Sequence, residues 1–260
     1  MSEAPALRVS GLVAGHSGVP VVTGLDLTVG AGEVVALLGA NGAGKTTTLL
    51  TVSGLIPKLG GTVQFGDVST SSARSQGRSS GIGRAVLRRG RSRQVVDLAR
   101  SGLAHVPEDR SLFFDLTTRE NILLGRRPTR SGGVAEDLDR VLGYFPGLVS
   151  HLDQMAGSLS GGQQQMLALA RALISRPKLL MVDELSLGLA PIIVEQLLPV
   201  LRTIAETTGA GVLIVEQHVH LALSISDRAY VLRRGKVTAS GSAGELAARP
   251  ELVEAGYFGD

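Results

Sequence analysis

A glycine-rich octapeptide, residues 39–46, constrains the fold more than any other part of this sequence. It reads GANGAGKT and matches the pattern GxxxxGK[ST]. It lies between the apolar run VVALL at 34–38 and a stretch predicted to be helical from Lys45 to about Ser53. In such a loop successive backbone N–H groups point at phosphate oxygens, and the following helix adds the positive end of its dipole. The motif therefore predicts a strand, a phosphate-binding loop and a helix, in that order.

The same loop predicts roles for two side chains. Lys45 is expected to reach the β- and γ-phosphates of a bound nucleotide, and the Thr46 hydroxyl is expected to ligate Mg²⁺. ATP and Mg²⁺ are accordingly the expected ligand and cofactor. The residues predicted to bind the nucleotide here are Gly39, Ala40, Asn41, Gly42, Ala43, Gly44, Lys45, Thr46 and Thr47.

Two adjacent acidic residues follow another apolar run. The sequence LLMV at 179–182 predicts a buried strand, and Asp183 and Glu184 come directly after it. A carboxylate at the end of such a strand suits the Mg²⁺ shell, which we assign to Asp183. Glu184 is the predicted general base, positioned to activate the attacking water.

Short apolar runs and turn residues predict an α/β fold. The longest runs, VVALL, LLMV and VLIV, each fall short of the roughly 20 residues that a membrane span needs, and they indicate buried parallel strands. Residues 7–38 alternate β-prone runs with glycine turns and predict an antiparallel sheet that leads into a central strand. Residues 102–158 are predicted to be mostly helical. The other predicted elements are a strand at 62–65, a helix at 160–175, strands at 179–182 and 212–215, a helix at 192–207, a hairpin at 230–240 and an amphipathic stretch at 244–257.

Composition excludes several classes of chemistry. The chain has no cysteine, which excludes disulfides, thiolate metal sites and cysteine nucleophiles. The first residues, MSEAPALRVS, show no basic segment followed by an apolar one, so no secretory signal is predicted. We expect a soluble protein that stays where it is made.

An arginine-rich segment dominates the charge balance. Residues 69–93 consist mainly of Ser, Gly and Arg, and the part from 74 to 93 carries seven arginines and no acid. The whole chain has a net charge of +3, so the remainder is mildly acidic at −4. This composition favours a solvated surface insertion. A contact between residues 74–93 and anionic lipid headgroups is the alternative. Nucleic-acid binding is disfavoured because no aromatic residues are interleaved and no recognition helix is evident.

The segment LSGGQ at 159–163 points to a family. Ser160 is a good N-cap, and Gln163 three residues later completes a capping box at the start of a helix. Together with the phosphate loop and the acidic pair, this segment resembles the signature of ABC ATPases. The resemblance implies that Ser160, Gly161, Gly162 and Gln163 contact the γ-phosphate of ATP held by an opposite subunit. A dimer with a composite active site is therefore expected.

The resemblance covers nearly the whole chain outside the arginine-rich insertion. It implies a P-loop NTPase fold with a RecA-like mixed-sheet core, an N-terminal antiparallel β-subdomain and an α-helical signature subdomain. We expect a nucleotide-binding domain at 7–240, which contains the insertion at 69–93 and the helical subdomain at about 109–165, and a C-terminal helical tail at 241–260. The segments that resemble the branch energising branched-chain amino-acid uptake are 106–110 (VPEDR), Phe113, 116–117, 120–121, 186–191 (SLGLAP), 215–217 (VEQ), 227–232 (DRAYVL) and 250–259.

Several positions depart from the pattern of the family. His16 aligns with the aromatic residue that usually stacks on adenine. Glu108 aligns with the glutamine that senses the γ-phosphate, and a carboxylate there can still contact the Mg²⁺ shell. The switch histidine aligns with Gln217, which we favour, and His218 follows immediately as the alternative. Leu185 replaces a proline, and Ala190 stands where many relatives have an aspartate.

The sequence thus predicts an ATP-hydrolysing subunit of an importer for branched-chain amino acids, located peripherally at the cytoplasmic face of the cell membrane. The expected partners are a second ATPase subunit, identical or related, two transmembrane permease subunits and an extracytoplasmic substrate-binding protein. The transported solute is not expected to touch this chain. Urea, amides or another small polar solute are alternative cargoes. A soluble ABC ATPase acting on DNA or ribosomes is disfavoured, because the chain has one copy of each motif and no heptad run.

Overall fold

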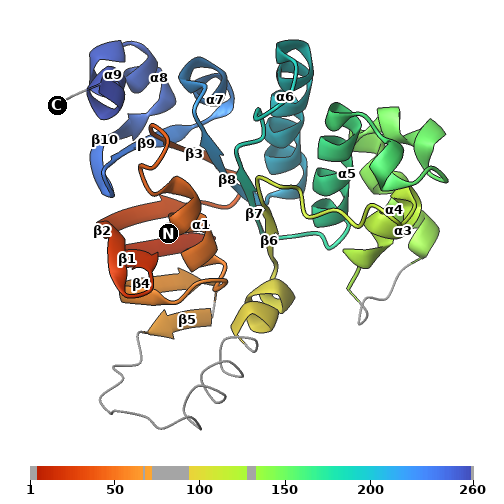
Figure 1. Cartoon of the computed structure of the whole chain (residues 1–260), viewed down its shortest axis with the longest axis horizontal. Coiled ribbons are helices and arrows are strands. Elements are labelled where there is room, and N and C mark those ends of the chain that lie inside the picture. The colour runs from red at the N-terminus through yellow and green to blue at the C-terminus, as the bar shows by residue number, and fades with distance from the viewer. Residues whose placement is uncertain (1–4, 67, 72–93, 128–132, 259–260) are drawn as a thin grey trace, which may run out of the picture.

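The computed structural model describes residues 5–66, 68–71, 94–127 and 133–258. Figure 1 shows two β-sheets with helices around them. The first sheet is antiparallel in the order β2-β1-β4-β5. Its strands are β1 (Leu7–His16), β2 (Val19–Val29), β4 (Lys58–Phe65) and β5 (Val68–Ser71). The predicted N-terminal antiparallel sheet is therefore present.

The second sheet has six strands in the order β10-β9-β3-β8-β7-β6. The five from β9 to β6 are parallel, and β10 pairs antiparallel at the edge. Their bounds are β3 (Val34–Leu38), β6 (Leu103–Val106), β7 (Leu179–Asp183), β8 (Gly211–Glu216), β9 (Arg228–Arg233) and β10 (Lys236–Ser242). This is the mixed sheet that the sequence predicts.

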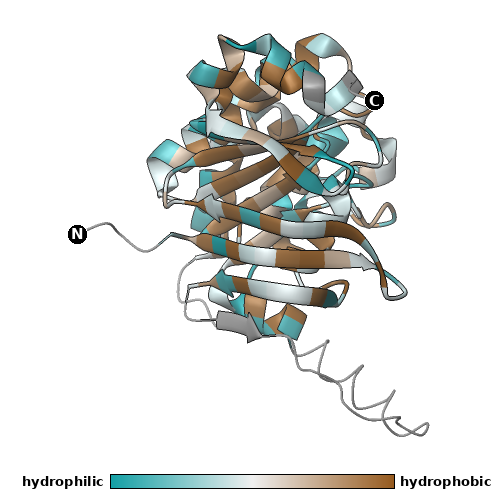
Figure 2. Ribbon diagram, turned by 90° about the vertical axis from the view of Figure 1, so that its left-hand side faces the viewer, coloured by the Kyte–Doolittle hydropathy of each residue, from teal (hydrophilic) through white to brown (hydrophobic). Residues whose placement is uncertain are grey.

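Alternate residues of the central strands enter two separate hydrophobic cores. In β3, Val34, Ala36 and Leu38 pack into one core, whereas Val35 and Leu37 pack into the other. Successive side chains of a strand point to opposite faces of the sheet, so a strand covered on both faces is apolar throughout. Brown, hydrophobic stretches accordingly run along the strands of both sheets in Figure 2.

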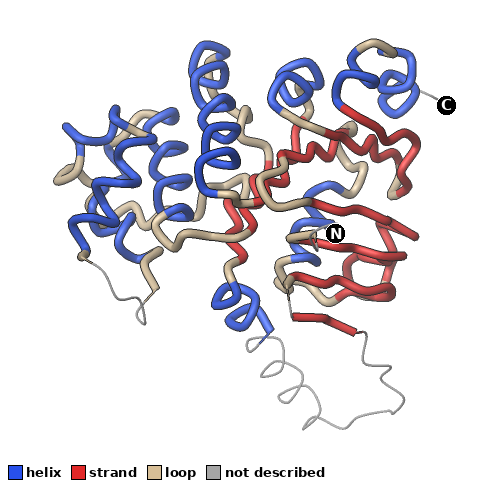
Figure 3. The backbone as a smooth tube through the Cα atoms, turned by 180° about the vertical axis from the view of Figure 1, so that it is seen from behind, coloured by secondary structure: helices blue, strands red, loops and turns tan. Residues whose placement is uncertain are grey.

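Helices lie around these sheets (Figure 1). Helix α1 (Lys45–Val52) contacts both sheets through β1, β2 and β7. Helices α3 (Thr118–Leu124), α4 (Val134–Tyr144) and α5 (Gly161–Leu173), with 3₁₀ turns at Pro146–His151 and Ala156–Ser158, lie away from the antiparallel sheet (Figure 3). Helices α6 (Pro191–Thr208), α7 (Val219–Ile225), α8 (Ala243–Ala247) and α9 (Pro250–Phe258) follow later in the chain, and residues 94–101, before β6, are helical as well. Among the described residues, no helix combines the length and apolar character that a membrane span requires.

One sequence-based expectation needs correction, and another lies mostly outside the described residues. Residues 102–158 are not as uniformly helical as predicted, because Leu103–Val106 form β6 and pair with β7 in parallel. A four-residue edge strand carries too short a pattern to stand out from the helices around it. The first residues of the predicted insertion, 69–71, belong to β5. Its remainder, 72–93, lies outside the described residues together with its alternative lipid contact.

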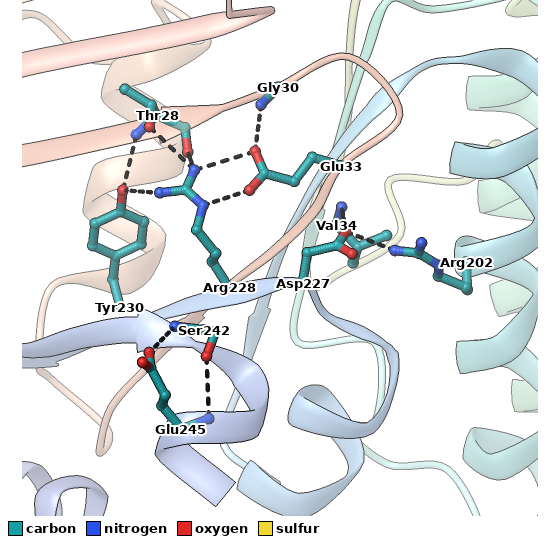
Figure 4. Close-up of polar contacts among 10 residues, drawn as sticks. All are labelled: Thr28, Gly30, Glu33, Val34, Arg202, Asp227, Arg228, Tyr230, Ser242 and Glu245. Atoms are coloured by element: carbon teal, nitrogen blue, oxygen red, sulfur yellow. Dashed lines mark hydrogen bonds and ion pairs between the residues drawn. The ribbon is translucent and has the colours of Figure 1, made fainter.

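A polar cluster joins the antiparallel sheet to the central one (Figure 4). Arg228 at the start of β9 makes a two-pronged contact with Glu33, which precedes β3. The same guanidinium donates to the backbone oxygen of Thr28 on β2 at 2.9 Å and to the hydroxyl of Tyr230 at 3.1 Å. Charge-assisted hydrogen bonds of this kind fix geometry as well as adding stability. The cluster therefore sets the orientation of one sheet against the other.

Strand register brings the carboxyl ends of β3, β7 and β8 to one edge. Leu38 pairs with Glu216, and Asp183 pairs with Val215. Ligands of open α/β sheets bind at this carboxyl edge. The ends of these three strands and the loops after them carry the predicted phosphate loop, the acidic pair and the two candidate switch residues.

Candidate nucleotide-binding and catalytic site

The phosphate loop connects β3 to α1, as predicted. Gly44 is the residue before α1 and has a φ of 106°, and a Cβ there would lie 2.6 Å from Cγ2 of Val22. Both its conformation and its surroundings therefore require glycine. The loop thus turns tightly into the helix and directs the amino end of α1 at the cleft.

Lys45 lies beneath this loop and is only 4% exposed. Its Nζ donates to the backbone oxygen of Gly39 at 2.8 Å and to that of Ala40 at 3.1 Å. The same Nζ lies 3.5 Å from Oε1 of Glu184. A buried ammonium needs such partners, because desolvation disfavours an unpaired charge.

Glu184 follows β7 in a backbone conformation that is unusual for a non-glycine residue, with a φ of 43°. Its N–H donates to the backbone oxygen of Val215 on β8 at 2.9 Å, which ties the turn to the neighbouring strand. The carboxylate is enclosed, since the residue is 9% exposed. Strain of this kind persists where the surrounding structure over-determines it, and it is common at catalytic residues.

The two candidates for the switch residue lie differently. Nε2 of Gln217 donates to Oε2 of Glu184 at 2.7 Å. His218 is exposed and lies at the N-terminus of α7. The structure therefore brings Gln217, rather than His218, to the predicted base.

Asp183 is buried at the end of β7, and its pKa is raised to about 6. Burial is the main cause; a hydrogen bond from the Thr46 side chain opposes it, and the charges of Glu184 and Glu108 add to it. Oδ1 of Asp183 is buried without a hydrogen-bond partner among the described protein atoms. An unpaired carboxylate oxygen beside a threonine hydroxyl fits a hard cation that takes most of its remaining ligands from phosphate and water.

Lys45, Glu184 and Gln217 line a cleft of about 390 Å³, and Asp183 lies beside it without lining it. Its lining residues are Val21, Asn41, Gly42, Gly44, Lys45, Thr46, Thr47, Glu108, Glu184, Leu187 and Gln217. A larger cavity of about 1270 Å³, lined by Arg8, Arg140 and Lys178 among others, contains none of the predicted site residues. The convergent charged groups, and not the volume, therefore identify the site.

The sequence matches the profile of the family described as ABC transporter over residues 22–186. This chain belongs to the ABC transporter family. It is 37% identical to the high-affinity branched-chain amino acid transport ATP-binding protein BraG of Pseudomonas aeruginosa, over 90% of this chain and 91% of that protein. It is 32% identical to the lipopolysaccharide export system ATP-binding protein LptB of Escherichia coli, over 98% of this chain and 97% of that protein.

A solved ABC structure has the same fold. This is cbiO1 from Clostridium perfringens, part of the ABC transporter complex cbiONQ. It matches with a TM-score of 0.78 and 23% identity, over 97% of this chain and 94% of that one. The predicted fold class and family are confirmed. So is the predicted class of activity, an ATP-binding and ATP-hydrolysing transport subunit.

The ABC signature segment begins α5 with the predicted capping box. The Ser160 hydroxyl accepts from the Gln163 N–H at 3.3 Å, and Oε1 of Gln163 accepts from the Ser160 N–H at 2.8 Å. Ser160 and Gly161 are exposed, whereas Gly162 is partly covered by Ile193. The segment thus presents the amino end of a 13-residue helix at the surface, as a site for anions requires.

The loop that carries Glu108 is tied to this signature helix. Glu108 itself is exposed and lines the cleft. Two residues on, the Arg110 side chain donates to Oε1 of Gln165 at 2.8 Å and to Oε1 of Gln164 at 3.2 Å. Arg171 donates back to the Arg110 backbone oxygen at 2.8 Å. A displacement of this loop would therefore be transmitted to α5.

His16 lies beside the phosphate loop at the end of β1. Its Nε2 is 3.3 Å from the Thr47 hydroxyl, so the imidazole is held close to the start of α1. The residue is exposed. Its position is compatible with the predicted contact to adenine.

Sequence reasoning missed two features of this site. Glu216, buried at the end of β8, accepts from the Ser186 N–H at 3.0 Å and from the Ser186 hydroxyl at 2.6 Å, and burial raises its pKa. The Tyr257 hydroxyl of α9 contacts both Gly39 and Gln217. Neither spacing nor local composition signals such contacts between distant segments.

Proposed function

We propose that this chain binds MgATP in this cleft and hydrolyses it as one of two cassettes that close on two nucleotides, driving branched-chain amino-acid uptake. The observation that carries the proposal is the contact of Glu184 with both Lys45 and Gln217 at the carboxyl edge of the sheet. One enclosed carboxylate thereby adjoins a phosphate-binding cation and an amide that can hold a water.

Each residue has a separate task in this proposal. Lys45 and the loop amides bind the phosphates and orient them, which accounts for much of catalysis in phosphoryl transfer. Glu184 takes a proton from the attacking water, and the Gln217 amide holds the carboxylate so that its free lone pairs face that water. Asp183 and Thr46, with Glu108 near them, would hold Mg²⁺. When bound, this ion neutralises charge on the β- and γ-phosphate oxygens.

The signature segment supports a second cassette as partner. A Cβ added at Gly161 would have its nearest neighbour, Cδ2 of Leu189, at 3.6 Å, which is ordinary contact. Packing within the chain therefore does not require glycine at 161. Close approach by a ligand does, and in the proposed dimer that ligand is the γ-phosphate held by the other copy.

We predict that Gly161→Asp prevents nucleotide-driven dimerisation and leaves the fold intact. Asp at the first position of a helix is favourable, so the melting temperature should not fall. Its carboxylate would instead meet the phosphate charge. Light scattering at saturating MgATP, in a Glu184→Gln background that blocks turnover, should show a dimer for the parent and a monomer for the variant.

Gly244→Asp is the matched control for this experiment. Gly244 is exposed in the first turn of α8, and a Cβ there meets nothing within 4 Å. It should dimerise like the parent. A dimer of unchanged affinity in Gly161→Asp would show that the signature segment does not contact the nucleotide of a second copy.

His16 is assigned as the platform for adenine. Stacking of a base on an aromatic ring contributes about 1–3 kcal/mol, so His16→Ala should lower ATP affinity about fivefold or more. His16→Tyr, with a larger ring, should raise it. A titration with inorganic tripolyphosphate is the control, because this ligand has no base to stack. If His16→Ala weakens both ligands equally, or weakens neither, the assignment is wrong.

The cargo and partners are inferred from the relatives. Identity is higher to BraG, named for branched-chain amino-acid transport, than to LptB, named for lipopolysaccharide export. Two permease subunits and an extracytoplasmic binding protein would complete the importer, with this chain bound to the permeases on the cytoplasmic side. Uptake of labelled leucine by cells with and without the chain tests this cargo. Loss of urea or amide uptake with unchanged leucine uptake would assign the alternative cargo.

A further inference from the structure

Tyr257 of α9 forms a hydrogen bond with the phosphate loop. Its hydroxyl accepts from the Gly39 N–H at 3.0 Å and lies 3.3 Å from the Gln217 backbone oxygen, to which it donates. Burial raises the pKa of Tyr257 above its usual value, so the hydroxyl keeps the proton that it donates. One oxygen thus joins the first residue of the phosphate loop to the proposed switch residue.

These two contacts close a ring of interactions around the site. From Tyr257 the ring passes through Gly39 to Lys45, whose Nζ donates to the Gly39 oxygen. It continues through the ion pair of Lys45 with Glu184 and the hydrogen bond from Gln217 to Glu184. The Gln217 backbone oxygen then returns it to Tyr257. The phosphate loop and Gln217 are thereby linked in two ways, once through Glu184 and once through Tyr257.

Close packing of α9 on the central sheet fixes where this hydroxyl lies. Val253 is 4% exposed and belongs to the core that contains Val231 of β9. A Cβ added at Gly256 would lie 2.3 Å from Cγ1 of Val231, so the helix backbone rests directly on the strand. The hydroxyl of the next residue therefore has little freedom of its own.

We propose that Tyr257 is a positioning residue for ATP hydrolysis. Its hydroxyl fixes the position of Gln217 relative to the phosphate loop and thereby orients Glu184. The proposal rests on the function assigned to Glu184 and Gln217 above. It makes α9 a part of the catalytic site and not only a covering element. Tyr257 contacts the phosphate loop at the N–H of its first residue, Gly39, so it should affect turnover much more than nucleotide binding.

Tyr257→Phe removes the hydroxyl and keeps the ring that packs around it. We expect kcat for ATP to fall about fivefold to tenfold, the equivalent of one ordinary hydrogen bond, while KM changes less than about twofold. Phosphate release by the full chain measures both constants, and the melting temperature reports the fold.

Tyr230→Phe is the matched control. The Tyr230 hydroxyl also makes two polar contacts, with the Thr28 N–H at 3.3 Å and with Arg228 at 3.1 Å, but it lies in the cluster between the two sheets. This variant should lose a similar amount of stability and keep kcat within about twofold of the parent. A fall in kcat that both variants share would reflect a loosened fold and would overturn the proposal.

A double mutant separates positioning from a general effect. If Tyr257 acts through the Gln217 side chain, then Tyr257→Phe should change kcat by less than about twofold in a Gln217→Ala background. If the two substitutions instead lower kcat by independent factors that multiply, Tyr257 does not act through the Gln217 side chain. If the parent hydrolyses ATP in a Glu184-dependent way and Tyr257→Phe behaves like Tyr230→Phe, only this inference fails. If the parent shows no Glu184-dependent hydrolysis, the proposed function itself fails.

Discussion

Glu184→Gln is expected to lower ATP turnover about 100-fold or more and to leave ATP binding intact, since a general base contributes about 10²–10⁴-fold. Gln has the volume of Glu and can still accept the hydrogen bond that Gln217 donates at 2.7 Å. It cannot take a proton from water. The backbone turn at 184, with its φ of 43°, is held by the hydrogen bond to Val215 and does not depend on the side chain.

The measurement pairs phosphate release with equilibrium binding of a fluorescent ATP analogue. Binding should tighten or stay unchanged, because the neutral side chain no longer repels phosphate from within the cleft. Glu206→Gln makes the same chemical change at an exposed pair with Arg202 on α6, 2.8 Å apart, and should retain turnover. Turnover at the parent rate in Glu184→Gln would mean that another carboxylate, with Glu108 the first to test, acts as the base.

The parts of this site that the sequence predicts are those encoded locally. The phosphate loop is eight consecutive residues between a strand and a helix, and the capping box joins Ser160 to Gln163 three residues away. Asp183 and Glu184 directly follow an apolar run. In each case short-range geometry fixes the arrangement, so the pattern carries the information.

The choice between Gln217 and His218 shows where this information ends. Both residues follow β8, and neighbouring residues at a strand end point in different directions. Which one faces Glu184 depends on the register of β8 against β7, where Val215 lies opposite Asp183. Register is set by packing of the whole sheet, which local composition does not determine.

Contacts between distant segments were not predictable for the same reason. Tyr257 is 218 residues from Gly39, and the Ser186–Glu216 pair spans 30 residues. Each depends on how separate elements dock, as does the short edge strand β6, which only its pairing with β7 identifies. The tail sequence resembled that of one family branch, but resemblance did not reveal which atoms its tyrosine contacts.

Lys45→Met is expected to weaken ATP binding about 100-fold, because it removes charge-assisted hydrogen bonds of about 1.5–3 kcal/mol each, and 1.4 kcal/mol is a factor of ten. Methionine has an unbranched side chain of similar length, so it can occupy the space of the Lys45 methylene groups. The substitution leaves the Gly39 and Ala40 oxygens without the donor that they share at 2.8 and 3.1 Å. It also leaves Glu184 as an enclosed carboxylate without its cation, so stability should fall as well.

Two further variants separate these effects in the same titration. Lys178→Met removes an exposed lysine from the larger cavity and should bind ATP like the parent. Lys45→Met combined with Glu184→Gln removes both members of the buried pair, so it should regain stability without regaining affinity. If this double variant regained ATP affinity as well as stability, Lys45 would act only by pairing with Glu184. Binding within tenfold of the parent in Lys45→Met alone would place the phosphates outside the loop at 39–46, and the assignment of the cleft would have to be abandoned.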